Sequence, residues 1–338
     1  MGERTPRPRV ALLQLLNGAW VTQALHAAAK LRLADFLAAG PLPVEELARQ
    51  AGTETQTTAR LLRTLAMFGV FSEVAPDQFA LTPMSEHLRS DRPDSLYHWA
   101  LMQGEAWHWQ AWGGLAENVR TGHTAFELKH QLPLFEFLDQ QPEAATLFNS
   151  AMAEMSSLAV KAIVQSYDFS AFRRVADVGG GEGILLQHLL EAHASVHGVL
   201  FDRPAALDKA RARLKGTPLE SRIEYQSGNF FETVPSGADA YVLKHILHDW
   251  NDVQAGKVLR ACRAQLPRQG RLLAIEYVLP AGDAFSPGKL LDLEMMVVCG
   301  GQERTLEHWK SLMADNGLTL DRVIATPSGV SIIEASPA

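Results

Sequence analysis

The chain has 338 residues but only two cysteines, Cys262 and Cys299, and neither belongs to a CxxC motif or a Cys/His cluster. Two isolated cysteines cannot build a disulfide framework or a structural zinc site, so disulfide-rich secreted folds and zinc fingers are excluded. This cysteine usage fits a reducing compartment, and we expect a cytoplasmic location.

Long apolar runs are also missing, since none approaches the roughly 18 residues that a membrane-spanning helix requires. The N-terminus imitates a secretory signal, because basic residues between Arg4 and Arg9 precede an apolar run. Gln14 and Asn17 interrupt that run and no clear cleavage site follows it. An amphipathic helix is therefore favoured over a signal peptide.

Positive charge is scarce: 31 Lys and Arg face 38 Asp and Glu, a net charge of −7. Such a balance disfavours nucleic acids and anionic membranes as partners. Whether the chain binds nucleic acid matters because its first domain has a suggestive pattern. Two helices are predicted, at residues 43–50 and 53–68, the second capped by Thr53. Two strands are predicted after them, at residues 70–74 and 78–81. This is a winged-helix pattern, which invites comparison with DNA-binding regulators.

The charge of this first domain, residues 1–100, opposes DNA binding. It holds ten basic and ten acidic residues, and its second helix offers only Arg60 and Arg63 as basic contacts. Residues 10–38 have helical apolar spacing with a break near Asn17 and Gly18. We expect a second copy of the chain to cover this apolar face, so that residues 1–100 form a homodimerisation domain. A DNA-binding regulator remains the weaker alternative.

The second predicted domain, residues 101–338, begins with a helical segment up to residue 165. Four of the seven tryptophans lie near or within it, at Trp99, Trp107, Trp109 and Trp112. They can serve core packing or wall an apolar pocket, and both interpretations stay open.

From residue 173 onward, strands alternate with helices, which is typical of an α/β fold with a parallel sheet covered on both faces. The chain ends in an antiparallel hairpin, and no internal repeat is present. The predicted strands are 173–178, 196–202, 223–226, 239–244, 271–276, 318–325 and 330–335, and the predicted helices are 183–194, 205–214 and 252–266.

A glycine-rich loop follows the first of these strands, with Gly179, Gly181 and Gly183 in a GxGxG spacing. The next strand ends in Asp202, about 20 residues later, where a carboxylate can accept both hydroxyls of a ribose. The loop and the acid together indicate a nucleoside cofactor. Ile184 replaces the third glycine of a dinucleotide fingerprint, and Glu182 in the turn disfavours a pyrophosphate. A sulfonium cofactor fits better than the nicotinamide cofactor of a dehydrogenase.

Five segments carry a resemblance to a known family, namely 177–183, 201–204, 228–231, 243–250 and 300–305. They resemble the motifs of the S-adenosylmethionine-dependent O-methyltransferases, of the plant caffeic-acid type and the bacterial type that methylates phenazines and polyketides. The resemblance covers essentially the whole chain. It implies a Rossmann-like class I methyltransferase domain with an antiparallel C-terminal hairpin, preceded by a helical, winged-helix-like dimerisation domain.

The resemblance also assigns the cofactor-binding positions. Gly179 and its neighbours would face the methionine moiety, Asp202 would hold the ribose, Asn229 and Phe230 would flank the adenine, and Lys244 would contact the cofactor from the fourth strand. The further positions expected at the cofactor are Asp177, Gly180, Gly181, Arg203 and Gly228.

On the acceptor side, the resemblance implies that His248 is the general base and that Glu276 and Glu303 bracket it. The expected pocket residues are Met152, Met155, His245, Asp249, Met295 and Met296. A phenol is mostly protonated at neutral pH, and a histidine oriented by a carboxylate is a suitable base for it. The expected acceptor is a small phenolic, quinone or polyketide-like molecule, and no metal is expected.

Two alternatives to this mechanism remain. His248 could be a structural capping residue beside Trp250, with His245 as the competing base. A relative with the same fold could also bind S-adenosylmethionine but catalyse decarboxylation, hydroxylation or a pericyclic reaction. Two positions depart from the family pattern: Glu182 stands where relatives often have threonine, and relatives often have a glycine near Gln131.

Overall fold

The computed structural model describes residues 7–338, apart from the side chain of Leu158. Residues 1–6, and with them Arg4 of the signal-like stretch, lie outside the described part. The chain forms two compact units, one made of residues up to 110 and 138–155, the other of residues 111–137 and 156–338. These units are compact groups of residues, so the expected functional boundary at residue 100 stays a prediction.

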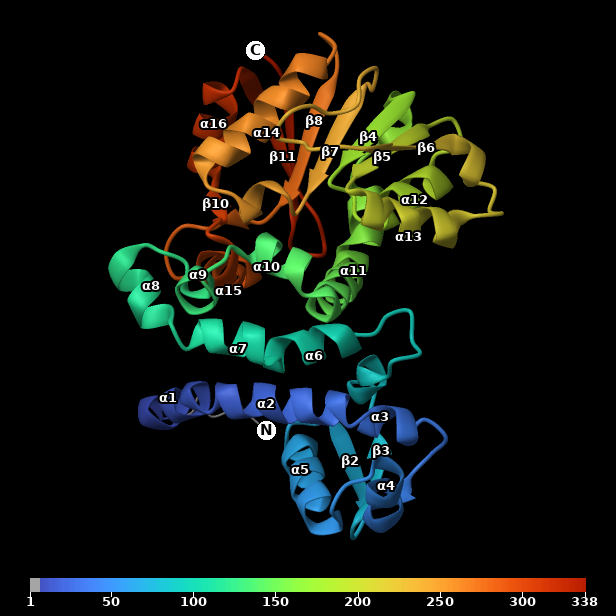
Figure 1. Cartoon of the computed structure of the whole chain (residues 1–338), viewed down its shortest axis with the longest axis vertical. Helices are drawn as coiled ribbons and strands as arrows, with labels where there is room; N and C mark the ends of the chain where they lie inside the picture. Colours follow the sequence, from blue (N-terminus) through green and yellow to red (C-terminus); the bar gives the residue numbers. More distant parts are fainter. Residues whose placement is uncertain (1–6) are drawn as a thin grey trace. The chain divides into compact units, whose positions relative to one another are not determined.

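The first unit contains a small three-stranded antiparallel sheet, in the order β1-β3-β2, surrounded by helices (Figure 1). Its elements are α1 (Pro8–Leu16), α2 (Gly18–Lys30), α3 (Leu33–Phe36), β1 (Leu42–Pro43), α4 (Val44–Ala51), α5 (Thr55–Met67), β2 (Phe71–Ala75), β3 (Gln78–Leu81), the 3-10 turn η1 (Ser85–Leu88) and α6 (Tyr97–Gly104).

The expected helix–helix–wing order is present, with one difference of detail at a helix cap. The break predicted near Asn17 separates α1 from α2. The predicted cap Thr53 is wrong, because the side chain of Glu54 accepts the N–H groups of Gln56 and Thr57 at the start of α5. Thr53 instead contacts the hydroxyl of Thr58 at 2.7 Å.

Residues 106–166 are helical, as predicted for the segment up to residue 165, and they are divided between the two units. They comprise α7 (Ala106–Trp112), α8 (Leu115–Thr121), α9 (Ala125–His130), α10 (Leu134–Gln140) and α11 (Pro142–Ser166). Gln131 ends α9 in a left-handed conformation with φ 59°. This conformation is the physical reason why a glycine suits that position, since a side chain is strained there.

The second unit is built around a seven-stranded sheet in the order β11-β12-β8-β7-β4-β5-β6. Five neighbouring strands, β8, β7, β4, β5 and β6, are parallel to one another. The two remaining strands, β12 and β11, are antiparallel to their neighbours. The predicted Rossmann-like sheet with an antiparallel C-terminal hairpin is therefore confirmed.

The strands of this sheet are β4 (Arg174–Val178), β5 (His197–Asp202), β6 (Ile223–Ser227), β7 (Ala240–Lys244), β8 (Arg271–Glu276), β11 (Leu318–Ala325) and β12 (Ser331–Pro337). The helices and helical turns are η2 (Phe169–Ala171), α12 (Ile184–Ala192), α13 (Pro204–Leu214), η3 (Glu220–Arg222), η4 (Leu247–Asp249), α14 (Asp252–Gln265), α15 (Pro287–Glu294), the π-helical turn η5 (Met295–Cys299) and α16 (Leu306–Asp315). The sequence patterns missed α15, η5, α16 and a short parallel pair, β9 (Val278–Leu279) with β10 (Arg304–Thr305).

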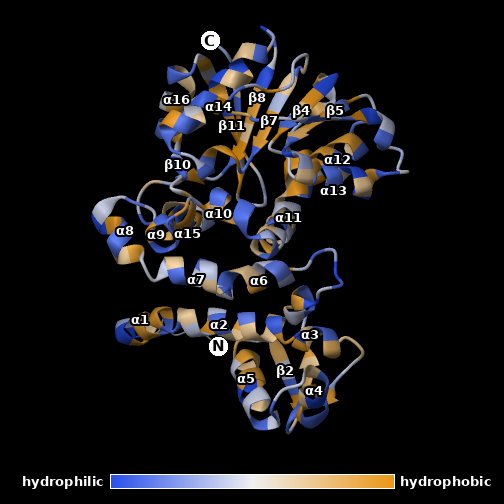
Figure 2. Ribbon diagram, in the orientation of Figure 1, coloured by the Kyte–Doolittle hydropathy of each residue, from blue (hydrophilic) through white to orange (hydrophobic). Residues whose placement is uncertain are grey.

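Both faces of the sheet are buried, which explains its continuous apolar strands (Figure 2). Alternate residues of β4 show the principle: Val175 packs in one core with α12, α13 and the end of α11, whereas Ala176 packs in the other with α14 and α16. Because five strands run parallel, their carboxyl ends meet at one edge, where the candidate cofactor-binding residues lie. Within residues 7–338, no helix is both long and apolar enough to cross a lipid bilayer.

Candidate active site

The glycine-rich loop lies between β4 and α12, and the acid at the end of β5 holds it in place. The N–H of Gly181 donates to Oδ2 of Asp202 at 2.8 Å, and the N–H of Arg203 donates to Oδ1 at 2.6 Å. Gly181 has φ 58°, a conformation in which a side chain would be strained. A carboxylate offers about four lone-pair positions, so Asp202 keeps acceptor capacity for ligand hydroxyl groups.

Beneath this loop, a buried carboxyl group and a lysine occupy neighbouring strands. Asp177 on β4 is 2% exposed, and its Oδ2 has no hydrogen-bond partner among the described residues. Burial raises the pKa of Asp177 to about 7, although Lys244 opposes the shift. Burial likewise lowers the pKa of Lys244 to about 8, against the attraction of Asp177 and Glu276. An unpaired buried acceptor suits a cationic or hydrogen-bond-donating ligand group.

The other side of the loop is apolar. A Cβ atom on Gly179, which has φ 70°, would lie 2.5 Å from Cδ1 of Ile246 and 3.6 Å from the ring of Phe230. Phe230 also packs edge-on against Phe231, with ring centroids 4.8 Å apart. Asn229 accepts the N–H of Phe231 through its side chain at 3.0 Å, which orders this turn. The predicted positions after β4, β5, β6 and β7 thus meet at one edge of the sheet.

His248 lies in the turn η4, directly after β7, and is 6% exposed. Its Nδ1 lies 2.6 Å from Oε1 of Glu303 and 3.6 Å from Oε2 of Glu276. Both expected glutamates are therefore present, but they approach the same ring nitrogen rather than opposite sides of the ring. This leaves Nε2 as the nitrogen that can exchange a proton with a ligand, with Oδ1 of Asp249 3.5 Å away.

Glu276 has a second contact that fixes this turn. Its Oε1 accepts the N–H of Ile246 at 3.1 Å and that of Leu247 at 3.0 Å. The side chain is fully buried at the end of β8. Glu276 therefore caps the turn that carries His248 as well as lying close to its ring.

Three carboxylates around one imidazole dominate the electrostatics. Burial alone would lower the pKa of His248, but Glu276, Asp249 and Glu303 outweigh it and raise this pKa to about 10. Burial raises the pKa of Asp249 to about 6 and raises the pKa of Glu303 despite the opposing pull of His248. For Glu276, His248 overcomes the effect of burial, so its pKa is lowered. The imidazole is thus held as a cation at neutral pH.

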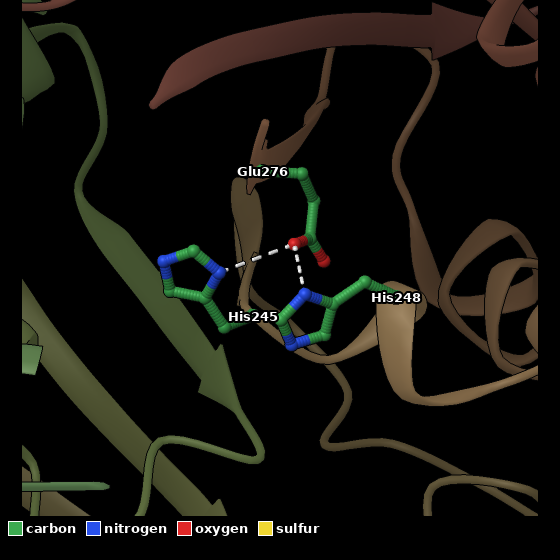
Figure 3. Close-up of side chains that lie close together, drawn as sticks. All are labelled: His245, His248 and Glu276. Atoms are coloured by element: carbon green, nitrogen blue, oxygen red, sulfur yellow. Dashed lines mark ion pairs between the residues drawn. The ribbon is translucent and has the colours of Figure 1, made fainter. Parts of the chain in front are cut away.

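His245 lies beside this group, three residues before His248. Its Nδ1 is 3.4 Å from Oε2 of Glu276, and the two imidazole centroids are 5.0 Å apart. Figure 3 shows both rings directed at the same carboxylate oxygen. Burial and the neighbouring Lys244 lower the pKa of His245 to about 4, so it is neutral where His248 is charged.

Residues on both sides of Glu303 form a clamp that the sequence pattern did not reveal, although the motif 300–305 contained it. Arg304 is fully buried and donates to the carbonyls of Leu247 at 2.9 Å and Trp250 at 2.8 Å. The N–H of Gln302 donates to the carbonyl of His248 at 2.8 Å. A Cβ atom on Gly301 would lie 1.9 Å from that carbonyl oxygen, so only glycine permits this approach.

The remaining predicted residues are divided between the units. Met152 and Met155 belong to the first unit, and Met295 and Met296 to η5 of the second. Their shared role in an acceptor pocket stays a prediction. The departure at Glu182 has a partner in the second unit, because its carboxylate lies 3.5 Å from Nζ of Lys209 on α13.

Two family models match this sequence. An O-methyltransferase domain matches residues 112–319, and an O-methyltransferase dimerisation domain matches residues 13–91.

Individual proteins are similar over nearly the whole chain. The phenazine O-methyltransferase PhzM of Lysobacter antibioticus is 44% identical over 96% of this chain and 95% of its own length. The crystal structure of LaPhzM superposes with a TM-score of 0.94 at 43% identity, covering 98% of this chain and 100% of that one. NcsB1, an O-methyltransferase of neocarzinostatin biosynthesis solved with S-adenosylmethionine and 2-hydroxy-5-methyl naphthoic acid, is 33% identical with a TM-score of 0.80, covering 94% of this chain and 96% of that one.

Proposed function

The chain belongs to the O-methyltransferase family, and we propose that it methylates a hydroxyl group of a small aromatic metabolite with His248 as the general base. One observation carries the proposal most directly. A buried histidine that follows β7 is held through Nδ1 by Glu303 at 2.6 Å, with Glu276 3.6 Å from the same nitrogen. This arrangement fixes the ring through Nδ1 and leaves Nε2, which lies 3.5 Å from Oδ1 of Asp249, as the nitrogen that can accept a proton.

S-adenosylmethionine is the methyl donor of this enzyme, and its bound sulfonium supplies an activated methyl group. The residues at the sheet edge fit this cofactor. Asp202 has acceptor capacity for the ribose hydroxyl groups, and the unpaired Oδ2 of Asp177 suits a cationic group. Phe230 offers an aromatic face beside Gly179 for the adenine. Glu182 places a further carboxylate in the turn, where a pyrophosphate would be repelled.

The protein's own task is then to position the acceptor and remove its proton. Nε2 of neutral His248 accepts the hydroxyl proton, and Glu303 and Glu276 stabilise the imidazolium that forms. Together with Asp249, these carboxylates outweigh burial, raise the pKa of His248 and so favour the imidazolium. Only the deprotonated fraction can act as base, so activity should increase with pH.

The dimerisation domain supports the proposal that the enzyme is a homodimer. The helix α1 has no buried residue, and Leu12, Leu15 and Leu16 are all more than half exposed. Nearby, Trp20 on α2 is 72% exposed. An apolar surface of this kind on a single chain is typical of a contact with another protein surface.

The decisive experiment is incubation of the purified protein with methyl-labelled S-adenosylmethionine and a panel of phenols, naphthoates, phenazines, quinones and aromatic amines. Mass spectrometry should show one labelled methyl group on the oxygen of a phenolic acceptor. Labelling of amines alone would contradict O-methylation. Conversion of an acceptor without gain of the label would instead support the non-methylating alternative.

A further inference from the structure

Beyond the proposed reaction, the site contains a cluster of metal-ligand type. Among the described residues, one group of three or more His, Cys, Asp or Glu side chains places its donor atoms within 4.8 Å of one another. The members are His245, His248 and Glu276, drawn in Figure 3. Two imidazoles and one carboxylate are a ligand set that zinc and similar divalent ions prefer.

The distances in this cluster suit a single small ion. Zinc binds nitrogen and oxygen ligands at about 2.0–2.1 Å in a tetrahedral arrangement, so neighbouring ligand atoms lie about 3.3–3.4 Å apart. Oε2 of Glu276 lies 3.4 Å from Nδ1 of His245 and 3.6 Å from Nδ1 of His248. All three donor atoms lie within 4.8 Å of one another, so the side chains must move closer together to complete the three-ligand geometry.

Buried side-chain atoms that make no hydrogen bond provide a second indication of a ligand. Nδ1 of His245 and Oε2 of Glu276 are both buried and lie 3.4 Å from each other, and neither makes a hydrogen bond among the described residues. Glu276 is fully buried, so an oxygen without a hydrogen bond is unfavourable there. Oε2 of Glu303, beside this group, is likewise buried without a hydrogen-bond partner among the described residues.

The backbone also directs His245 into the cluster. This residue has φ 52°, a left-handed conformation that is uncommon for residues other than glycine. Its N–H donates to the carbonyl of Ile275 at 3.1 Å, next to Glu276 on β8. Such a backbone conformation persists only where the surrounding structure enforces it, and residues of this kind concentrate at functional sites.

We propose that a divalent ion of the zinc type binds between His245, His248 and Glu276 and inhibits the enzyme. The ion coordinates Nδ1 of His248, displaces any proton there to solvent and replaces the hydrogen bond to Glu303. The neutral ring then carries its one proton on Nε2, so it cannot accept a proton from an acceptor hydroxyl. The inhibition rests on the proposed function, whereas the metal site does not.

Cobalt(II) is the appropriate probe, since its visible spectrum reports a tetrahedral site directly. The wild-type protein should bind one equivalent with a tetrahedral ligand-field spectrum. His245→Asn should weaken this binding at least tenfold, because asparagine tolerates the left-handed backbone but is a poor ligand. His197→Asn is the matched control, since His197 is exposed at the opposite end of β5, and it should bind like the wild type.

Circular dichroism confirms that each variant is folded before titration. The site is refuted if the wild type shows no tetrahedral spectrum, or if His245→Asn binds cobalt as tightly as the wild type. Zinc should abolish methyl transfer at the concentration that displaces cobalt, and a chelator should restore it. The protein could bind cobalt in this way and yet methylate no acceptor. That outcome would contradict the proposed function but would still support the metal site.

Discussion

The guanidinium of Arg304 donates to the main-chain carbonyl of Leu247 at 2.9 Å, one residue before the proposed base. It also donates to the carbonyl of Trp250, two residues after the base. The turn that presents His248 is thus held on both sides by one buried side chain. Asp252 balances the charge of this guanidinium, with the two groups 2.9 Å apart.

Arg304→Lys should lower kcat more than it changes cofactor affinity. A lysine amine cannot reproduce the planar fork of donors, so carbonyl oxygens are left unpaired and the turn loosens. Loss of these bonds should destabilise the protein by about 1–3 kcal/mol in urea unfolding. Arg322→Lys is the control, because Arg322 is largely exposed where it pairs with Glu334. A folded Arg304→Lys enzyme with native kcat and native pH profile would exclude the positioning role.

His248→Ala should reduce turnover by about 10²- to 10⁴-fold, the usual contribution of a positioned general base. The affinity for S-adenosylhomocysteine, measured by calorimetry, should hardly change. His248 is proposed to contact the acceptor, whereas the glycine-rich loop of the cofactor site is held by Asp202. High pH should partly restore turnover, since more acceptor is then already ionised. His197→Ala should behave like the wild type. Near-native methyl transfer by His248→Ala at pH 7 would disprove the base assignment.

The pH dependence should report the carboxylates around His248. Its folded-state pKa of about 10 lies above the ordinary value of 6.5, so kcat/KM should increase with pH well above neutrality. The same shift stabilises the fold below the unfolded-state pKa, and this stabilisation should disappear as pH rises through the folded-state value.

Glu303→Gln should move the rising limb of kcat/KM to lower pH, because one of the groups that raise the pKa of His248 is then neutral. The amide oxygen can still accept the bond from Nδ1. Glu307→Gln, at the exposed start of α16, provides the control. A limb at the same pH in wild type and Glu303→Gln would show that His248 does not control the profile.

Asp202→Ala should weaken binding of S-adenosylhomocysteine by about 1.5–3 kcal/mol, because charge-assisted bonds to the ribose are lost. The loop would also lose the bond between Gly181 and Asp202. Asp202→Asn separates the two effects, since it keeps an acceptor for Gly181 but removes the charge. Asp208→Asn, at an exposed position of α13, is the control. Unchanged affinity in Asp202→Ala would remove this residue from the cofactor site.

Replacing both Leu15 and Leu16 with glutamate should convert the expected dimer to a monomer. These leucines are exposed on α1, and burying four charges in a symmetric interface would be strongly unfavourable. Light scattering measures the change, with Val253→Glu, at an exposed position of α14, as the control. A wild-type chain that is monomeric at micromolar concentration would contradict the prediction.

The sequence alone determined the features that depend on local spacing. Alternating strands and helices predicted the parallel sheet, and the hairpin turn predicted its antiparallel edge. The glycines and Asp202 fell at the ends of neighbouring strands, and parallel strands necessarily bring such ends together. The resemblance added His248, Glu276 and Glu303, and the structure places all three in contact distance.

The tertiary structure decided those contacts of the site that join segments far apart in the sequence. Spacing along the chain did not show that Glu276 and Glu303 approach one ring nitrogen, nor that Arg304 clamps the turn before it. These contacts join segments up to 57 positions apart. The pKa of His248 also depends on the tertiary structure, because it is set by burial and by three carboxylates. Periodicity records which face of an element is buried, but only the packed fold brings separate elements' polar atoms together.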